Sequence, residues 1–232
     1  MKVPNHLGLI IDGNRRWAKA RGLPPWYGHR KGAETLEKCL NWCMELGIPN
    51  VSVYVLSKEN LEKRPKREIK EILKLLKEYL KKMEKEENSI LDKYEVKVRF
   101  VGNLENLPKG LLKIMRRIMK KTAKYQKRML NLLIAYSGKF ELTHVLKRIA
   151  EKAIKLGRLE IREKDIEANL LVPIPLDLVI RTGGYHRLSN FLIWQASYAE
   201  TYFTETLWPD FTKKELIKAI KWFNGVRRNF GR

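Results

Sequence analysis

The sequence predicts an α/β protein in which about six mostly parallel strands are flanked by helices within one domain. Short apolar runs alternate with amphipathic stretches along 232 residues. The runs are apolar on both faces, which is typical of parallel strands buried between helices. With 44% hydrophobic residues the chain can bury a full core. No linker or change of composition divides it, so we expect residues 1–232 to form a single domain.

Each element of this fold follows from a local pattern. Apolar runs predict strands over residues 6–12, 50–56, 94–101, 129–136, 177–183 and 199–204. Amphipathic stretches predict helices over residues 33–46, 65–88, 108–128, 139–156 and 212–227. The first helix carries Leu36, Leu40 and Cys43 on one face and ends at Gly47. Cys39 lies one turn before Cys43, so we interpret both as core thiols rather than as a disulfide or a zinc site.

The chain is strongly basic, with 48 Lys and Arg against 26 Asp and Glu and a formal charge of +22. This charge suits a nucleic-acid-binding domain, but no nucleic-acid motif is present and we expect no nucleic-acid partner. Residues 109–128 contain nine Lys or Arg and no acid. This basic amphipathic helix suits either contact with an anionic membrane or a core helix with a solvated charged face.

Features of a membrane span or a secretion signal are not recognisable in the sequence. No apolar run reaches the roughly 18 to 20 residues that a spanning helix needs. Residues 1–12 lack the charged, apolar and small-residue regions of a signal peptide. We therefore expect a cytoplasmic protein, with a peripheral position at the membrane surface as an alternative.

Polar loops follow three of the predicted strands. They are DGNRRW (residues 12–17), SKENLEKRP (residues 57–65) and RTGGYHRLSN (residues 181–190). Ligands of parallel sheets bind outside the carboxyl ends of the strands, so these loops are the candidate site.

The first loop suits a diphosphate. Gly13 lets backbone approach a ligand, and Arg15 and Arg16 offer forked donors to phosphate oxygens. Asp12 would repel that anion unless a hard cation lay between them, and Mg²⁺ bound by one carboxylate and substrate phosphates is the usual solution. A helix cap at Asp12 followed by exposed arginines fits the same spacing, and both interpretations remain open.

The other two loops add further polar side chains, namely Ser57, Glu59, Asn60, Arg64, Arg181, His186, Arg187 and Ser189. Five arginines across three loops exceed the needs of one phosphate. They suit two diphosphates, although surface arginines are also common in so basic a protein. Glu200 is either a second acidic site residue or a capping or salt-bridged side chain.

Four segments in this order resemble the cis-prenyltransferase family, which includes undecaprenyl and dehydrodolichyl diphosphate synthases. They are HLGLIIDGNRRWAKARG with GH at residues 28–29, YVLSKENLEKRP, AYSGKFEL and DLVIRTGGYHRLSNFLIWQASYAETYFTETLWPDF. The resemblance spans residues 6–211, and the DDxxD motif of trans-prenyltransferases is absent. Abundant Lys, Glu and Ile indicate an archaeal-type or thermophile member.

The resemblance implies a Mg²⁺-dependent homodimer that condenses isopentenyl diphosphate with an allylic diphosphate, farnesyl or geranylgeranyl, to a Z-polyprenyl diphosphate. It also implies a hydrophobic product tunnel between sheet and helices. The implied allylic cradle is Asp12, Gly13, Asn14, Arg15, Arg16, Trp17 and His29. The implied isopentenyl site is Arg181, His186, Arg187 and Ser189. Asn60 is the implied proton acceptor, with Ser57, Glu59 and Arg64 nearby, and Asp12 and Glu200 are the implied metal-associated acids.

The sequence departs from the family pattern at several positions. Pro25 replaces an arginine, for which Arg15 offers a substitute, Leu61 replaces an aromatic residue and Tyr185 replaces a glutamate. Drift within a subfamily is one explanation for these changes. The alternatives are that the enzyme makes a short product, that it uses an unusual acceptor, or that the chain is a weakly active subunit of a heteromeric complex. The tail RRNFGR (residues 227–232) resembles the segment that completes a neighbouring subunit's site, which underlies the expected homodimer.

Overall fold

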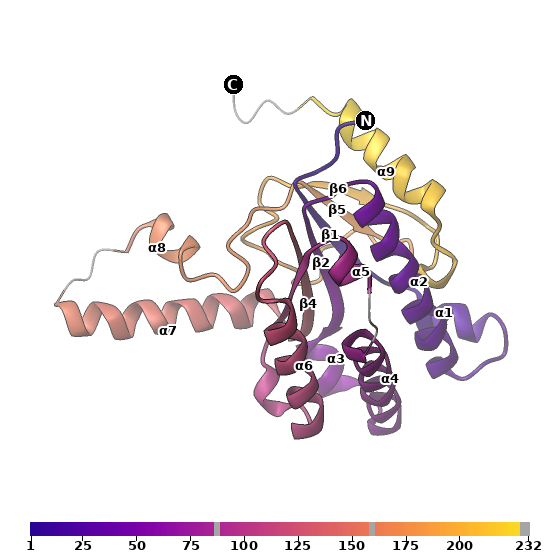
Figure 1. Ribbon diagram of the computed structural model, residues 1–232, viewed down its shortest axis with the longest axis horizontal. Coiled ribbons are helices and arrows are strands. Elements are labelled where there is room, and N and C mark those ends of the chain that lie inside the picture. The colour runs from indigo at the N-terminus through magenta and orange to yellow at the C-terminus, as the bar shows by residue number, and fades with distance from the viewer. Residues whose placement is uncertain (86–88, 158–160, 228–232) are drawn as a thin grey trace.

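The fold is built on one six-stranded sheet (Figure 1). A computed structural model describes residues 1–85, 89–157 and 161–227. The strands are β1 (His6–Ile10), β2 (Asn50–Ser57), β3 (Val96–Val101), β4 (Arg128–Tyr136), β5 (Leu178–Arg181) and β6 (Glu200–Phe203). Their order is β3-β4-β2-β1-β5-β6, and every neighbouring pair runs parallel. The predicted α/β class and its six strands are confirmed.

Helices connect and cover the strands. They are α1 (Asn14–Lys19), α2 (Pro25–Glu45), α3 (Lys58–Lys63), α4 (Lys66–Lys85), α5 (Ile90–Lys93), α6 (Lys109–Thr122), α7 (Gly138–Leu156), α8 (Glu163–Glu167) and α9 (Lys213–Gly225), with 3-10 turns η1 (Leu104–Asn106) and η2 (Trp208–Asp210). The helix predicted from residue 33 begins earlier because Pro25 suits a first helical turn. The helices α3, α5 and α8 are only four to six residues long, too short to show a helical repeat.

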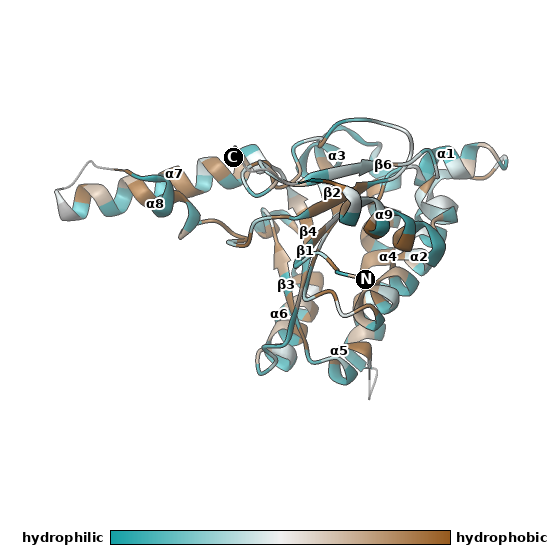
Figure 2. Cartoon of the chain, turned by 90° about the horizontal axis from the view of Figure 1, so that it is seen from above, coloured by the Kyte–Doolittle hydropathy of each residue, from teal (hydrophilic) through white to brown (hydrophobic). Residues whose placement is uncertain are grey.

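Alternate strand residues face two different cores, as the two-residue period of a strand requires. Leu7 and Leu9 pack with the helices α2, α4, α6 and α9 in the main core, which also holds the free thiols of Cys39 and Cys43. Ile10 packs in a second core. The strands at the centre of Figure 2 are predominantly hydrophobic, whereas the surrounding helices alternate hydrophobic and hydrophilic residues. The helices α7 and α8 extend away from the sheet (Figure 1).

The basic helix α6 uses its apolar side within the protein. Leu111, Ile114, Met115 and Ile118 are buried in the main core. The lysines and arginines therefore occupy the solvent side, as expected for a core helix with a solvated face. None of the helices within the described ranges is long and apolar enough to cross a membrane.

The carboxyl edge of the sheet positions the three polar loops. The chain passes from β1 to β2 on one side, and β5 later joins β1 on the other side. Ile10 pairs with Arg181, so the first and third loops leave the sheet side by side. The second loop leaves the end of β2 at Ser57. A parallel sheet has its ligand crevice at such a divergence of connections.

Candidate active site

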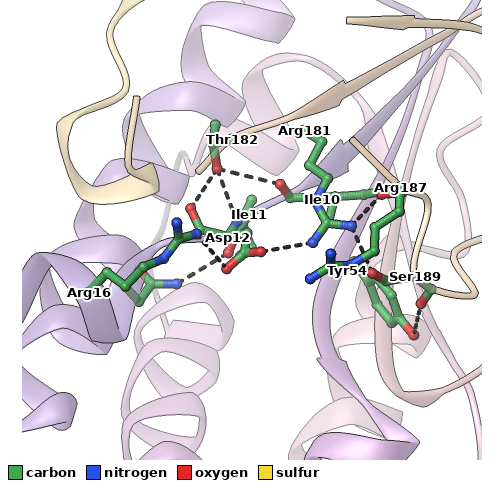
Figure 3. Close-up of polar contacts among 10 residues, drawn as sticks. Ile10, Ile11, Asp12, Arg16, Tyr54, Arg181, Thr182, Arg187 and Ser189 are labelled. Carbon is green, nitrogen blue, oxygen red and sulfur yellow. Dashed lines mark hydrogen bonds and ion pairs between the residues drawn. The ribbon is translucent and has the colours of Figure 1, made fainter. Parts of the chain in front are cut away.

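Asp12 lies between two arginines at the carboxyl edge of the sheet (Figure 3). Its Oδ2 accepts a hydrogen bond of 2.9 Å from Arg181 Nη2, and its Oδ1 lies 3.6 Å from Arg16 Nη2. Thr182 fixes the backbone here, because its hydroxyl donates to the Asp12 carbonyl at 2.7 Å and accepts from the Asp12 amide at 3.0 Å. Asp12 does not cap α1: that helix has Gly13 at its N-cap and no side-chain cap.

Arg181 is the buried anchor of the third loop. Its side chain is only 4% exposed, and one guanidinium nitrogen donates to Ser189 Oγ at 2.7 Å and to the Arg187 carbonyl. Its Nε is buried without a partner among the described residues. Arg187 and His186 are exposed, and the His186 ring stacks on Phe203 at 4.7 Å. The structure thus brings Arg181, Arg187 and Ser189 together beside Asp12.

A second cationic cluster forms around the buried carboxylate of Glu68 on α4. Glu68 Oε1 lies 3.1 Å from His29 Nε2, 3.1 Å from Arg64 Nη1 and 3.6 Å from Arg15 Nε. Burial lowers the pKa of His29, with Arg64 and Arg15 adding to this effect, while the hydrogen bond to Glu68 opposes it. The His29 ring is therefore neutral at pH 7, and it can donate or accept a hydrogen bond without adding charge to the cluster.

Glu68 was absent from the sequence-based prediction. Its only sequence signal is the spacing of four residues from Arg64, which places both on one face of a helix. Many exposed helical pairs share that spacing, so only the burial of Glu68 shows that it organises this cluster. Asp12 is also close enough to Arg64 to affect its pKa, which burial lowers and Asp12 tends to raise. The two clusters are thus electrostatically connected.

The second loop forms the helix α3. Ser57 caps this helix, since its hydroxyl accepts a hydrogen bond of 3.0 Å from the Asn60 amide. The Asn60 side chain lies half-buried on α3. Glu59 accepts a hydrogen bond of 3.1 Å from Asn190 of the third loop. Burial tends to raise the pKa of Glu59, but the hydrogen bond from its own backbone amide, followed by those with Asn190 and Ser57, keeps this pKa below its ordinary value. The second and third loops are thereby joined.

The first loop and α1 pack against Leu207 and η2. Gly13 has φ of +112°, and a Cβ there would meet Leu207 at 2.9 Å, so both conformation and space require glycine. Asn14 donates through Nδ2 to the Ile11 carbonyl at 3.2 Å. The Trp17 indole donates to Asp210 at 2.7 Å, which anchors α1 on η2. Trp17 does not contribute to the cavity described next.

An apolar cavity runs between the sheet and the helices α2 and α4. Asn14 and His29 lie in its wall, so it borders the Glu68 cluster. Further lining comes from the strand residues Val55 and Leu132. Helix side chains provide most of its apolar surface, including Leu36, Leu40, Ile72, Leu75, Leu76, Leu80 and Met83. The cavity therefore joins a cationic cluster to a space suited to hydrocarbon.

Glu200 is the first residue of β6 and so lies at the amino-terminal ends of the strands, whereas Asp12 follows the carboxyl end of β1. It pairs with Leu178, which itself pairs with Leu7. Asp12 follows Leu7 by five residues, a separation of roughly 16 Å along the strands at about 3.3 Å per residue. The two acids therefore do not meet within one chain, and the metal-associated role of Glu200 stays a prediction.

The side chains around Asp12 suit Mg²⁺ that is bound jointly by protein and substrate. No three His, Cys, Asp or Glu side chains converge within residues 1–85, 89–157 and 161–227. Mg²⁺ does not need such a cage, because one carboxylate and substrate phosphates are sufficient. Asp12, half-buried and flanked by arginines that can hold phosphate, fits that arrangement.

Comparison with known proteins agrees with this geometry. Residues 10–231 match the family model described as "Putative undecaprenyl diphosphate synthase". A relative from Methanopyrus kandleri, named tritrans,polycis-undecaprenyl-diphosphate synthase (geranylgeranyl-diphosphate specific), is 43% identical over 100% of this chain and 86% of its own. An isoprenyl transferase of Aquifex pyrophilus is 41% identical over 100% of this chain and 97% of its own.

A solved structure shares the whole fold. Lavandulyl diphosphate synthase from Lavandula x intermedia, in complex with dimethylallyl diphosphate, superposes with a TM-score of 0.92 at 29% identity and covers 99% of both chains. The family match extends over nearly the whole sequence, and the fold and the ordered loops agree with it. The chain therefore belongs to the cis-prenyltransferase family, that of the undecaprenyl diphosphate synthases.

Proposed function

We propose that this protein condenses isopentenyl diphosphate with a farnesyl or geranylgeranyl diphosphate to give a Z-polyprenyl diphosphate. The observation that carries the proposal is the pairing of two cationic clusters at one sheet edge, one of which borders an apolar cavity. Two diphosphates and one growing hydrocarbon chain need this combination. A nucleic-acid-binding domain needs neither the cavity nor Asp12 among its cations.

The two clusters have different roles in the proposal. Arg181 and Ser189, which already form a hydrogen bond, hold isopentenyl diphosphate together with Arg187. His29, Arg15 and Arg64 hold the allylic diphosphate beside the cavity entrance, with Arg16, Gly13 and Asn14 completing the cradle. Arginine forks match diphosphate oxygens and stabilise the charge that develops as the leaving group departs.

The reaction forms one carbon–carbon bond and breaks the allylic carbon–oxygen bond, releasing diphosphate. A proton then leaves the isopentenyl unit as the cis double bond forms. Asn60 is assigned as the acceptor of this proton, with Ser57 and Glu59 beside it, on the strength of the family resemblance. Mg²⁺ held by Asp12 would supply positive charge to the departing diphosphate.

The cavity is proposed as the product tunnel. It is lined almost entirely by apolar side chains between α2, α4 and the sheet, so a prenyl chain can extend into it without burying unpaired polar groups. Val55 lies in its wall, where its bulk is proposed to limit product length.

Assembly and location belong to the same proposal. A homodimer is expected from the tail RRNFGR, but residues 228–232 lie outside the described residues. A cytoplasmic enzyme touching an anionic membrane through the exposed basic side of α6 suits a lipid product. That contact would be electrostatic, because the apolar side of α6 is buried.

The test is incorporation of radiolabelled isopentenyl diphosphate with C10, C15 or C20 allylic diphosphates. We expect long polyprenols with C15 or C20 starters, abolished by EDTA and restored by Mg²⁺. Asp12→Asn should lose activity, whereas Asp165→Asn, on the distant helix α8, should retain it. No incorporation with any starter would favour an unusual acceptor or a heteromeric complex instead.

A further inference from the structure

Three arginines surround the exposed ring of Tyr185 in the third loop. The guanidinium carbons of Arg187 and Arg16 lie 4.2 and 4.5 Å from the ring centroid, and that of Arg181 lies 5.8 Å away. All three distances fall within the range of cation–π attraction. Tyr185 is 42% exposed, so its ring is not needed to fill a core.

The ring joins groups from both sides of Asp12. Arg16 comes from α1, after β1, whereas Arg181 and Arg187 come from the end of β5 and the loop that follows. Figure 3 shows Arg16 and Arg181 reaching Asp12 from opposite directions. Tyr185 therefore contacts arginines assigned to both substrate diphosphates.

An aromatic ring holds arginines in a way that a carboxylate cannot. Stacking uses the face of the guanidinium, while its N–H donors lie in the plane and stay available to phosphate oxygens. A carboxylate would engage those donors itself. Arg187 has no ion pair within the part of the chain that the structure describes, so its charge is also left for a ligand.

We propose that Tyr185 is a positioning residue that preorganises Arg16 and Arg187 for the diphosphates of the two substrates. The inference rests on the proposed function for the identity of those substrates. Its physical basis is that an ordered arginine loses less conformational freedom when it binds an anion. Within residues 1–85, 89–157 and 161–227, the ion pairs of this cluster are those of Asp12 with Arg16 and Arg181, so the neutral ring orders the arginines without cancelling further positive charge.

The first test measures binding of inorganic diphosphate in the presence of Mg²⁺ by calorimetry. Tyr185→Leu and Tyr185→Gln remove the ring, and each should weaken binding roughly 10-fold. Tyr185→Phe keeps the ring and should stay within about twofold of the natural protein. Tyr94→Leu is the matched control, because Arg128 lies 5.2 Å from the Tyr94 ring just before β3, at the opposite edge of the sheet.

The second test measures steady-state kinetics. Tyr185→Leu should raise KM for both substrates with a smaller change in kcat, and Tyr185→Phe should restore both KM values. Unchanged diphosphate binding in the Leu and Gln variants, or equal weakening in the Phe variant, would overturn the proposal. Diphosphate binding needs no turnover, so a protein that binds as expected but transfers no prenyl group would contradict the proposed function and leave the role of Tyr185 intact.

Discussion

Replacing Glu68 with glutamine tests whether one buried carboxylate organises the allylic cradle. Its side chain is 5% exposed and lies within 3.6 Å of His29, Arg15 and Arg64. Glutamine keeps the size of the side chain and removes the charge. The variant therefore isolates the electrostatic contribution of this group.

The expected destabilisation follows from the burial of each partner. Removing one member of a buried ion pair costs about 3–5 kcal/mol because the remaining charge stays desolvated. Arg15 is 55% exposed and can rehydrate, whereas Arg64 is 20% exposed and cannot do so fully. We therefore expect Glu68→Gln to lower the free energy of unfolding by about 3 kcal/mol, the low end of that range.

Urea denaturation followed by circular dichroism measures this loss. Glu78→Gln is the matched control on the same helix, because Glu78 forms an exposed pair with Arg30 at 3.6 Å, and such pairs contribute about 0–1 kcal/mol. Glu68→Gln should also raise KM for the allylic diphosphate more than KM for isopentenyl diphosphate. Equal destabilisation by the two variants would refute the reasoning about burial.

Three further predictions concern stability and product length. Burial lowers the pKa of His6. As pH drops below about 6.5, the unfolded chain therefore takes up a proton before the folded chain does, and the free energy of unfolding should fall. His6→Gln should flatten this pH dependence in urea titrations, and the same pH dependence in the variant would contradict the prediction. Gly32→Ala would place a Cβ 2.0 Å from Asn14 Oδ1 and should cost about 2–4 kcal/mol, whereas Gly110→Ala, with nothing nearer than 3.8 Å, should stabilise by up to about 1 kcal/mol. Val55→Ala should lengthen the polyprenols seen by chromatography, and an identical product distribution would remove Val55 as a length determinant.

The layered fold could be predicted because its signals are local. The apolar run at residues 50–56 falls on a strand whose residues face cores on both sides of the sheet. The repeat in residues 33–46 falls on α2. Strand order and the exact parallel register depend on contacts between distant segments, so the sequence pattern could not provide them.

The site could be predicted only in part, for the same reason. Asp12 and Arg181 carry polar groups at strand ends, and the structure brings them within hydrogen-bonding distance. In the sequence Glu68 resembles many other charged helix residues, and only its burial distinguishes it. Glu200 was placed near the site by family resemblance, but the register of β6 puts it at the other edge within this chain. Tyr185 departs from the family pattern, but its contacts with three arginines depend on the folding of distant segments and have no local sequence signal.

The most direct test of the central claim is the geometry of the double bonds in the product. Purified protein would be incubated with Mg²⁺, isopentenyl diphosphate and geranylgeranyl or farnesyl diphosphate, and the dephosphorylated product examined by carbon-13 NMR. The account predicts that every added unit carries a cis double bond, with trans bonds confined to the starter. Added units with trans double bonds would contradict it.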